Sequence, residues 1–104
     1  MSYTPLHVHS EYSLLDGLSK TSQIASRIKD IGATSCALTD HGTVSGAVDF
    51  VKTMKDNGLK PILGCEVYIC HGDSKDRTPD NKGLFHQVIL AKNLEGWKTL
   101  LELV

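Results

Sequence analysis

Short apolar runs of strand length alternate along this chain with stretches whose apolar residues recur at helical spacing. The expected strands cover residues 4–9, 35–39, 60–63 and 86–91. The third is expected to be interrupted at residues 64–66 and to continue extended over residues 67–69. The expected helices cover residues 21–31, 44–57 and 94–104. Such alternation is typical of parallel strands joined by right-handed crossovers. We therefore expect an α/β fold with about four parallel strands, as a small open sheet or as the first half of a barrel.

Each expected helix carries an apolar stripe along one side. The stripes comprise Ile24, Ile28 and Ile31 in the first helix, Val44, Ala47, Val48, Val51 and Met54 in the second, and Leu94, Trp97, Leu100, Leu101 and Val104 in the third. Gly32 and Gly58 end the first two helices, whereas the third has no stop signal, which favours a piece of a larger domain. The polar residues 70–83 are expected to form a mobile surface loop.

Composition excludes several classes of protein. The chain has 104 residues, 40% hydrophobic and 22% charged, with a net charge of -1, so no bulk electrostatic attraction to nucleic acid or anionic membrane is expected. No run is long and apolar enough to span a bilayer, and the first residues carry no secretory signal. Cys36, Cys65 and Cys70 are an odd number without C-x-x-C spacing, as for free thiols in a reducing compartment. A cytoplasmic protein is expected.

Two histidines stand close together near the start of the chain. His7 and His9 are two residues apart in the first expected strand, so both side chains point to the same face. Two imidazoles side by side would repel if both were protonated, and a divalent cation bound by both neutral rings removes that problem. Two histidines on a solvent-facing strand are the alternative, because this short motif also occurs by chance.

Further polar residues follow the other expected strands. Asp40 and His41 follow the second, Glu66 lies just past the third, and Asp16 lies in the loop after the first. The carboxyl ends of parallel strands meet at one edge, so these side chains should gather there with His7 and His9. Imidazole with carboxylate suits zinc, manganese or iron, and such mixed sites often hold adjacent metals that clamp a phosphate and activate water.

Each of these residues also has a structural interpretation. Asp16 suits a turn, and Asp40 suits a helix cap, although we favour a role for Asp40 as a hydrogen-bond partner that holds a metal-ligating imidazole. Glu66 follows an apolar strand, so its carboxylate should be partly buried and in need of a partner. His86 begins its strand, and this position alone argues against a place at the metal edge.

Four segments together carry a recognisable signature. They are HVHSEYSLLDG (7–17), ALTDHG (37–42), PILGCEVY (61–68) and HQVILAKN (86–93) with Gly96 and Leu100. These segments, in this order, resemble the PHP (polymerase and histidinol phosphatase) domain, in the form that opens the α subunit of bacterial DNA polymerase III, a C-family replicative polymerase. The resemblance covers nearly the whole chain and is weakest over residues 70–83.

The resemblance implies a fold and a metal site. PHP domains are distorted seven-stranded β/α (TIM-like) barrels with two or three divalent metals, zinc foremost, at the carboxyl ends of the strands. The ligands that it carries over to this chain are His7, His9, Asp16, His41, Glu66 and His86. Stand-alone relatives hydrolyse phosphoesters. In several polymerases the domain is a metal-dependent 3′–5′ exonuclease that proofreads, and in others it is a platform, including for a separate proofreading exonuclease subunit.

The chain departs from the family pattern in length. The last ligands of the family, a Cys or His and then an Asp with a His, are absent, as are the polymerising domains. We expect residues 1–104 to be the N-terminal portion of a PHP domain that contributes to a phosphoesterase or exonuclease site in DNA replication. Its expected partners are the rest of the α subunit, DNA through that subunit, and a proofreading exonuclease subunit.

Two other functions stay open. The first is a non-catalytic fragment that stabilises the polymerase or docks a partner. The second is a stand-alone phosphoesterase such as a histidinol phosphatase, although the sequence of residues 12–17 favours the polymerase type. Half a barrel would leave an open sheet edge and an uncovered apolar face, so the isolated chain is expected to self-associate.

Overall fold

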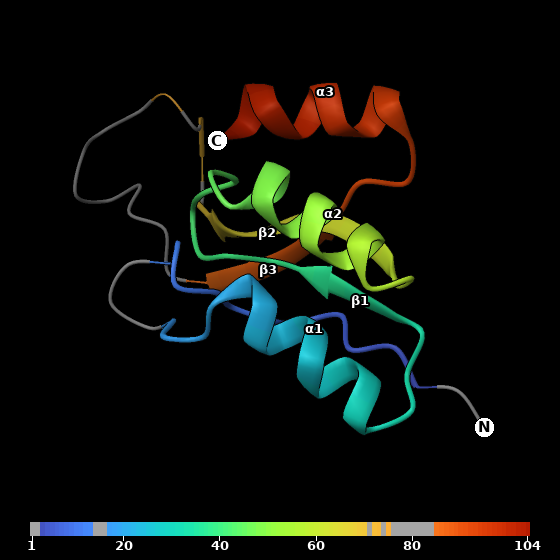
Figure 1. The fold of residues 1–104 in the computed structure, drawn as a ribbon. Helices are drawn as coiled ribbons and strands as arrows, with labels where there is room; N and C mark the ends of the chain where they lie inside the picture. The colour runs from blue at the N-terminus through green and yellow to red at the C-terminus, as the bar shows by residue number, and fades with distance from the viewer. Residues whose placement is uncertain (1–2, 14–16, 71, 74, 76–84) are drawn as a thin grey trace.

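The computed structural model describes residues 3–13, 17–70, 72–73, 75 and 85–104 (Figure 1). Its elements, in chain order, are α1 (Thr21–Asp30), β1 (Ser35–Leu38), α2 (Ala47–Asp56), β2 (Lys60–Ile69), β3 (Phe85–Leu90) and α3 (Leu94–Leu103). The predicted α/β class is therefore correct for the described residues, and the helix over 21–31 is confirmed as α1. The second helix begins three residues later than predicted. Most of the expected 70–83 loop, and Asp16, lie outside the described residues.

The sheet of the described residues is mixed rather than parallel. Its order is β1-β2-β3, with β1 parallel to β2 and β2 antiparallel to β3. The prediction of about four parallel strands is therefore wrong. A parallel neighbour needs a crossover back to the opposite end of the sheet, but Phe85 pairs with Ile69, so the chain enters β3 at the end where β2 finishes.

Strand β2 is continuous through the interruption predicted at residues 64–66. Leu63 is the last residue of β2 in the ladder with β1, and Gly64 is the first residue of β2 in the ladder with β3, so the strand changes partner without a break. A Cβ atom at Gly64 would clash with the carbonyl oxygen of Ile89. Glycine stands inside this strand because the β3 backbone approaches it closely.

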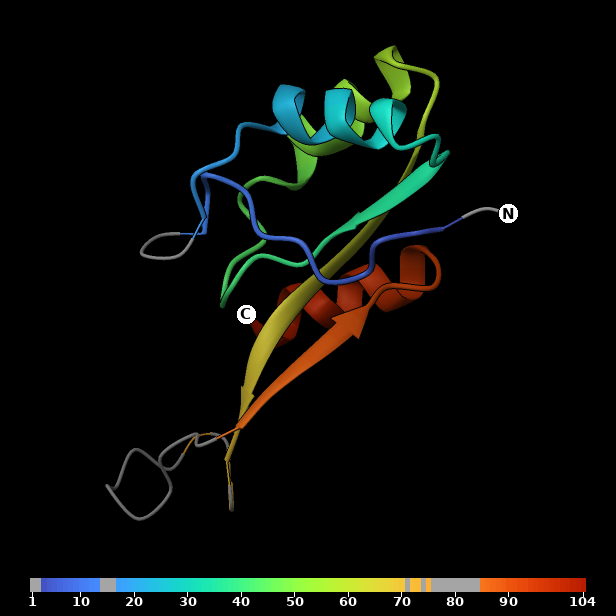
Figure 2. The same ribbon diagram turned by 90° about the horizontal axis from the view of Figure 1, so that it is seen from below.

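The predicted strand over residues 4–9 is an extended segment beside β1, without regular strand structure (Figure 2). The amide of Ala37 donates to the carbonyl of Pro5 at 2.9 Å, and the amide of Thr39 donates to the carbonyl of Val8 at 2.9 Å. The two donors are two residues apart in β1, whereas their two acceptors are three residues apart in this segment. The amide of Val8 donates to the Thr39 hydroxyl at 2.9 Å instead of to a backbone carbonyl. The segment is held in place, but its register prevents a regular ladder.

The apolar core lies where α1 and α2 pack against the sheet (Figure 2). Its residues are Ile24, Ala25, Ile28, Ala33, Cys36, Leu38, Phe50, Met54 and Leu59. The predicted stripe of α2 is wrong at Val48, which is 82% exposed, and it omits Phe50, which is fully buried. At 100° per residue, Phe50 and Met54 share the buried face with Ala47, whereas Val48 turns away from it.

Helix α3 follows β3, and its Leu100 is buried. Asn93 precedes it and accepts a hydrogen bond from the amide of Gly96 at 2.9 Å, so this helix begins with a side-chain cap. The three cysteines are free thiols, as expected. Among the described residues, no helix combines the length and apolar character needed to span a bilayer.

Candidate metal centre

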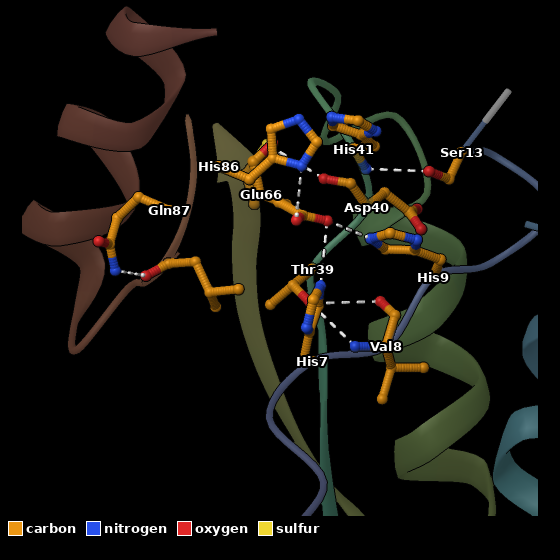
Figure 3. A network of polar contacts seen from close by, with 12 residues as sticks. His7, Val8, His9, Ser13, Thr39, Asp40, His41, Glu66, His86 and Gln87 are labelled. Carbon is orange, nitrogen blue, oxygen red and sulfur yellow. Dashed lines mark hydrogen bonds and ion pairs between the residues drawn. The ribbon is translucent and has the colours of Figure 1, made fainter. Parts of the chain in front are cut away.

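Four histidines surround the carboxylate of Glu66 (Figure 3). Glu66 lies in β2 and its side chain is only 8% exposed. His7 and His9 reach it from the extended segment beside β1, His41 from the residues that follow β1, and His86 from β3. Histidines from three separate parts of the chain therefore surround one carboxylate, which comes from a fourth part.

The first pair of histidines contacts one oxygen of this carboxylate. His7 Nε2 lies 3.0 Å and His9 Nε2 lies 2.7 Å from Glu66 Oε1. The two ring centroids are 5.2 Å apart, and the rings are nearly perpendicular at 79°. The side chain of His7 is 57% exposed, whereas that of His9 is 20% exposed. His9 therefore lies deeper in the site, and His7 lies at its solvent side.

The second pair lies on the other side of the carboxylate. His86 Nδ1 is 3.2 Å from Glu66 Oε2, and the His86 ring centroid is 4.5 Å from that of His41. The backbone of His41 forms a parallel bridge with that of Glu66. The amide of Glu66 donates to the carbonyl of Asp40, and the amide of Gly42 donates to the carbonyl of Glu66, each at 2.9 Å. This bridge extends the pairing of β1 with β2 just far enough to place His41 beside Glu66.

The position of His86 corrects an inference from the sequence. In a parallel sheet the first residue of a strand lies far from the carboxyl ends of its neighbours. Because β3 is antiparallel, His86 instead pairs with Tyr68 near the carboxyl end of β2. The start of β3 therefore belongs to the same edge as the other histidines, in agreement with the family resemblance.

The donor set forms two groups that share one residue. His7, His9 and Glu66 make the first group, and His41, His86 and Glu66 make the second; within each group the candidate ligand atoms lie within 4.8 Å of one another. Two imidazoles and one carboxylate are a common ligand set for catalytic zinc and also suit manganese or iron. A carboxylate with one oxygen toward each group fits a pair of adjacent ions. The residues present therefore fit divalent metals.

Asp40 holds the loop that follows His9. Asp40 is 1% exposed, and its carboxylate accepts hydrogen bonds from the Ser10 amide at 2.5 Å and the Ser10 hydroxyl at 2.7 Å. In return, the amide of His41 donates to the hydroxyl of Ser13 at 2.9 Å. The bonds of the Asp40 carboxylate to described residues thus go to Ser10 rather than to an imidazole, the role that we favoured from the sequence.

The sequence reasoning did not identify Ser10 and Ser13, although both are fully buried in the structure. A second anchor lies nearby, where the hydroxyls of Tyr12 and Thr21 both donate to Asp49 Oδ2, at 3.3 and 2.8 Å. Serines and tyrosines in a polar loop carry no local signal of such pairing. The only indication in the sequence is their position immediately after the histidine pair.

The pKa of Glu66 lies below its ordinary value of 4.5. Burial of the carboxylate acts to raise this pKa, but the hydrogen bonds from His7 and His9 and the positive charge of these rings lower it and outweigh burial. A group whose pKa is depressed by folding stabilises the fold above its unfolded pKa. That contribution is lost as the pH falls through the folded-state value.

We therefore expect acid to remove the stabilising effect of Glu66 in the metal-free protein. Thermal unfolding of wild-type protein and Glu66→Gln, followed by circular dichroism in the presence of a chelator, should show the wild type melting higher at about pH 5, with a difference that narrows toward about pH 3. A difference in melting temperature that stays constant over this range would contradict a depressed pKa.

The chain is similar to known proteins over almost its whole length. Residues 5–104 match the family described as PHP domain. The chain is 47% identical over 100 residues to the DNA polymerase III subunit alpha of Helicobacter pylori strain J99, 48% over 101 residues to that of Campylobacter jejuni, and 42% over 105 residues to that of Treponema pallidum. These alignments cover 96%, 97% and 99% of this chain but only 8%, 8% and 9% of the relatives. The chain thus spans about a twelfth of their length.

Solved structures agree on the fold. An amidohydrolase from Chromobacterium violaceum with bound sulfate and no metal superposes with a TM-score of 0.59 at 28% identity, over 66% of this chain and 24% of that protein. A protein from Bifidobacterium adolescentis whose name assigns it to the metal-dependent phosphoesterases superposes with a TM-score of 0.58 at 22% identity, over 70% of this chain and 24% of that protein. The match over residues 5–104 and the identity to the three α subunits show that the chain belongs to the PHP domain family.

Proposed function

We propose that this PHP segment supplies most of the ligands of a divalent-metal centre that hydrolyses phosphoesters. The observation that carries the proposal is the sharing of Glu66 between two pairs of histidines. A site of this composition has two nearby cation positions with neutral nitrogen donors and one bridging acid. The name of the phosphoesterase neighbour supports this class of chemistry.

The proposed ligands divide into those that form the floor of the site and those that flank its opening. Glu66 and His9 are mostly buried, whereas His7 and His86 are 57% and 45% exposed. A substrate phosphate would thus approach from the side of His7 and His86. Bound divalent cations would make water a better nucleophile and neutralise charge on the phosphoester. His41 and Asp16 complete the proposed ligand set, and Asp16 lies outside the described residues.

In the complete protein, the proposed role is that of a PHP segment in a DNA polymerase III α subunit, with DNA as the substrate and 3′–5′ proofreading hydrolysis as the reaction. Zinc is the first candidate metal, with manganese or iron next, in a cluster of two or three ions. The proposed location is the cytoplasm, where replication takes place in bacteria. The high identity to three α subunits supports this assignment.

A structural role is the second candidate, and the surface of α3 favours it. Leu94, Leu101, Leu103 and Val104 are 68%, 46%, 62% and 46% exposed. Trp97 of the same helix lines an apolar groove together with Leu63 and residues 47–52 of α2. Because the chain covers only about 8% of its relatives, the remainder of the α subunit is the proposed partner for this apolar surface.

Metal content of the purified chain tests the proposal. We expect stoichiometric zinc, manganese or iron by elemental analysis, with roughly half of it lost in a His7→Ala/His9→Ala variant, because the group of His41, His86 and Glu66 keeps its three ligands. Circular dichroism establishes that the variant is folded. Metal no higher than background in the wild-type chain would leave the structural role as the better account.

A further inference from the structure

An exposed aromatic ring lies directly beside the candidate metal centre. Tyr68 is two residues beyond Glu66 in β2, so both side chains project from the same face of the strand. The ring centroid of Tyr68 lies 4.8 Å from that of His41 and 4.8 Å from that of His86. His86 is also the cross-strand partner of Tyr68. The ring is thus held against two of the proposed ligands.

This arrangement leaves much of the ring accessible. Tyr68 is 56% exposed, in a part of β2 that pairs with β3 alone, beyond the last residue paired with β1. Its phenol makes no hydrogen bond to another described residue. Its contacts with His41 and His86 are tilted at 36° and nearly perpendicular at 83°, so neither imidazole is stacked flat on the ring.

We propose that Tyr68 forms a nucleobase subsite next to the metal centre, on which the base of a nucleotide stacks while its phosphate occupies the metal ions. This inference rests on the proposed phosphoester chemistry of the centre. Tyr68 lies two residues, or about 7 Å of backbone, beyond Glu66, so its ring flanks the metal centre, where a base could stack beside a bound phosphate. Base stacking on an aromatic side chain tolerates every base, as a site that acts on DNA of any sequence requires.

Equilibrium binding to the zinc-loaded chain tests the subsite without relying on catalysis. Calorimetric titration would compare three probes, namely inorganic phosphate, deoxyribose 5-phosphate and dAMP. We expect the wild-type chain to bind dAMP about tenfold more tightly than deoxyribose 5-phosphate. Tyr68→Phe should keep this gain, and Tyr68→Leu should lose it. Affinity for inorganic phosphate should be the same in all three proteins.

Phe85 provides a matched control. It is 60% exposed and precedes His86 in β3, so its side chain alternates to the opposite face of the strand. Phe85→Leu should still bind dAMP about tenfold more tightly than deoxyribose 5-phosphate. In NMR spectra, the ring protons of Tyr68 should shift on addition of dAMP but not on addition of inorganic phosphate.

The outcomes separate this inference from the proposed function. Tight binding of inorganic phosphate without a gain from the base overturns the subsite alone. Loss of the gain in Tyr68→Phe as well as in Tyr68→Leu assigns it to the hydroxyl and overturns stacking. Weaker binding of inorganic phosphate in Tyr68→Leu would mean that Tyr68 supports the metal ligands instead. A metal-loaded chain that binds no probe, or a chain that takes up no zinc, manganese or iron, overturns both proposals.

Discussion

Replacement of Glu66 by Gln should abolish metal binding at both proposed positions, although the substitution changes only one heavy atom of the side chain. Glu66 is the member common to both candidate ligand groups, with Oε1 toward His7 and His9 and Oε2 toward His86. A neutral amide is a poor ligand for zinc, and its nitrogen cannot bind a cation at all. We expect the affinity for each ion to fall by more than the roughly 10–100-fold that loss of a ligand's hydrogen-bond partner costs.

Elemental analysis after dialysis and titration with a chromophoric chelator would measure this loss. His7→Ala/His9→Ala should abolish only one site, and His86→Ala should weaken only the other. Glu102→Gln, at an exposed position of α3, removes the same charge away from the centre and should leave the metal content unchanged. Retention of one full equivalent by Glu66→Gln would show that the two groups do not share this residue.

Replacement of Phe50 by Ala should destabilise the fold more than any other single truncation of α2. Phe50 is fully buried and belongs to the cluster formed with α1 and β1. Truncation of a buried phenylalanine leaves a cavity and costs about 3–5 kcal/mol. A domain of this size has a free energy of unfolding of roughly 5–15 kcal/mol, so this loss is a large share of its stability.

Thermal unfolding followed by circular dichroism, in the presence of a chelator, would measure this effect. Phe50→Ala should lower the melting temperature by more than about 10 °C, or abolish the cooperative transition. The control is Val48→Ala on the same helix, where Val48 is 82% exposed and the expected change is within about 0.5 kcal/mol. Similar melting of the two variants would mean that the buried face of α2 is assigned wrongly.

The positions of the helices could be predicted because their signals are local. Ile24 and Ile28 at helical spacing, followed by Gly32 at a φ of 75°, place α1 and its end within one residue. The pattern of α2 was more ambiguous. Its apolar residues extend around more than one side of the helix, and the sequence does not say which side faces the core. Packing on α1 and the sheet selects the side of Phe50 and leaves Val48 exposed.

The candidate site was predictable to a similar degree. The histidines and Glu66 stand out from the sequence because each lies at or next to an apolar strand, and the structure brings His7, His9, His41 and His86 around Glu66. The hydrogen bonds of Ser10 to Asp40 and of His41 to Ser13 could not be anticipated. They join residues about 30 positions apart, and small hydroxyl side chains in a loop carry no periodic signal.

The sequence by itself therefore determined where the three helices and most of the strands lie, which residues are candidate metal ligands, and which family the chain resembles. These are properties of short segments, set by side-chain periodicity, turn residues and ligand chemistry. Only the tertiary structure decided that β3 runs antiparallel to β2, that His86 consequently joins the site, and that one carboxylate lies between two pairs of imidazoles. Strand direction and shared contacts depend on pairing between distant residues. The alternation of side chains within one strand does not specify whether its neighbour runs parallel or antiparallel, because the same backbone groups form hydrogen bonds in both arrangements.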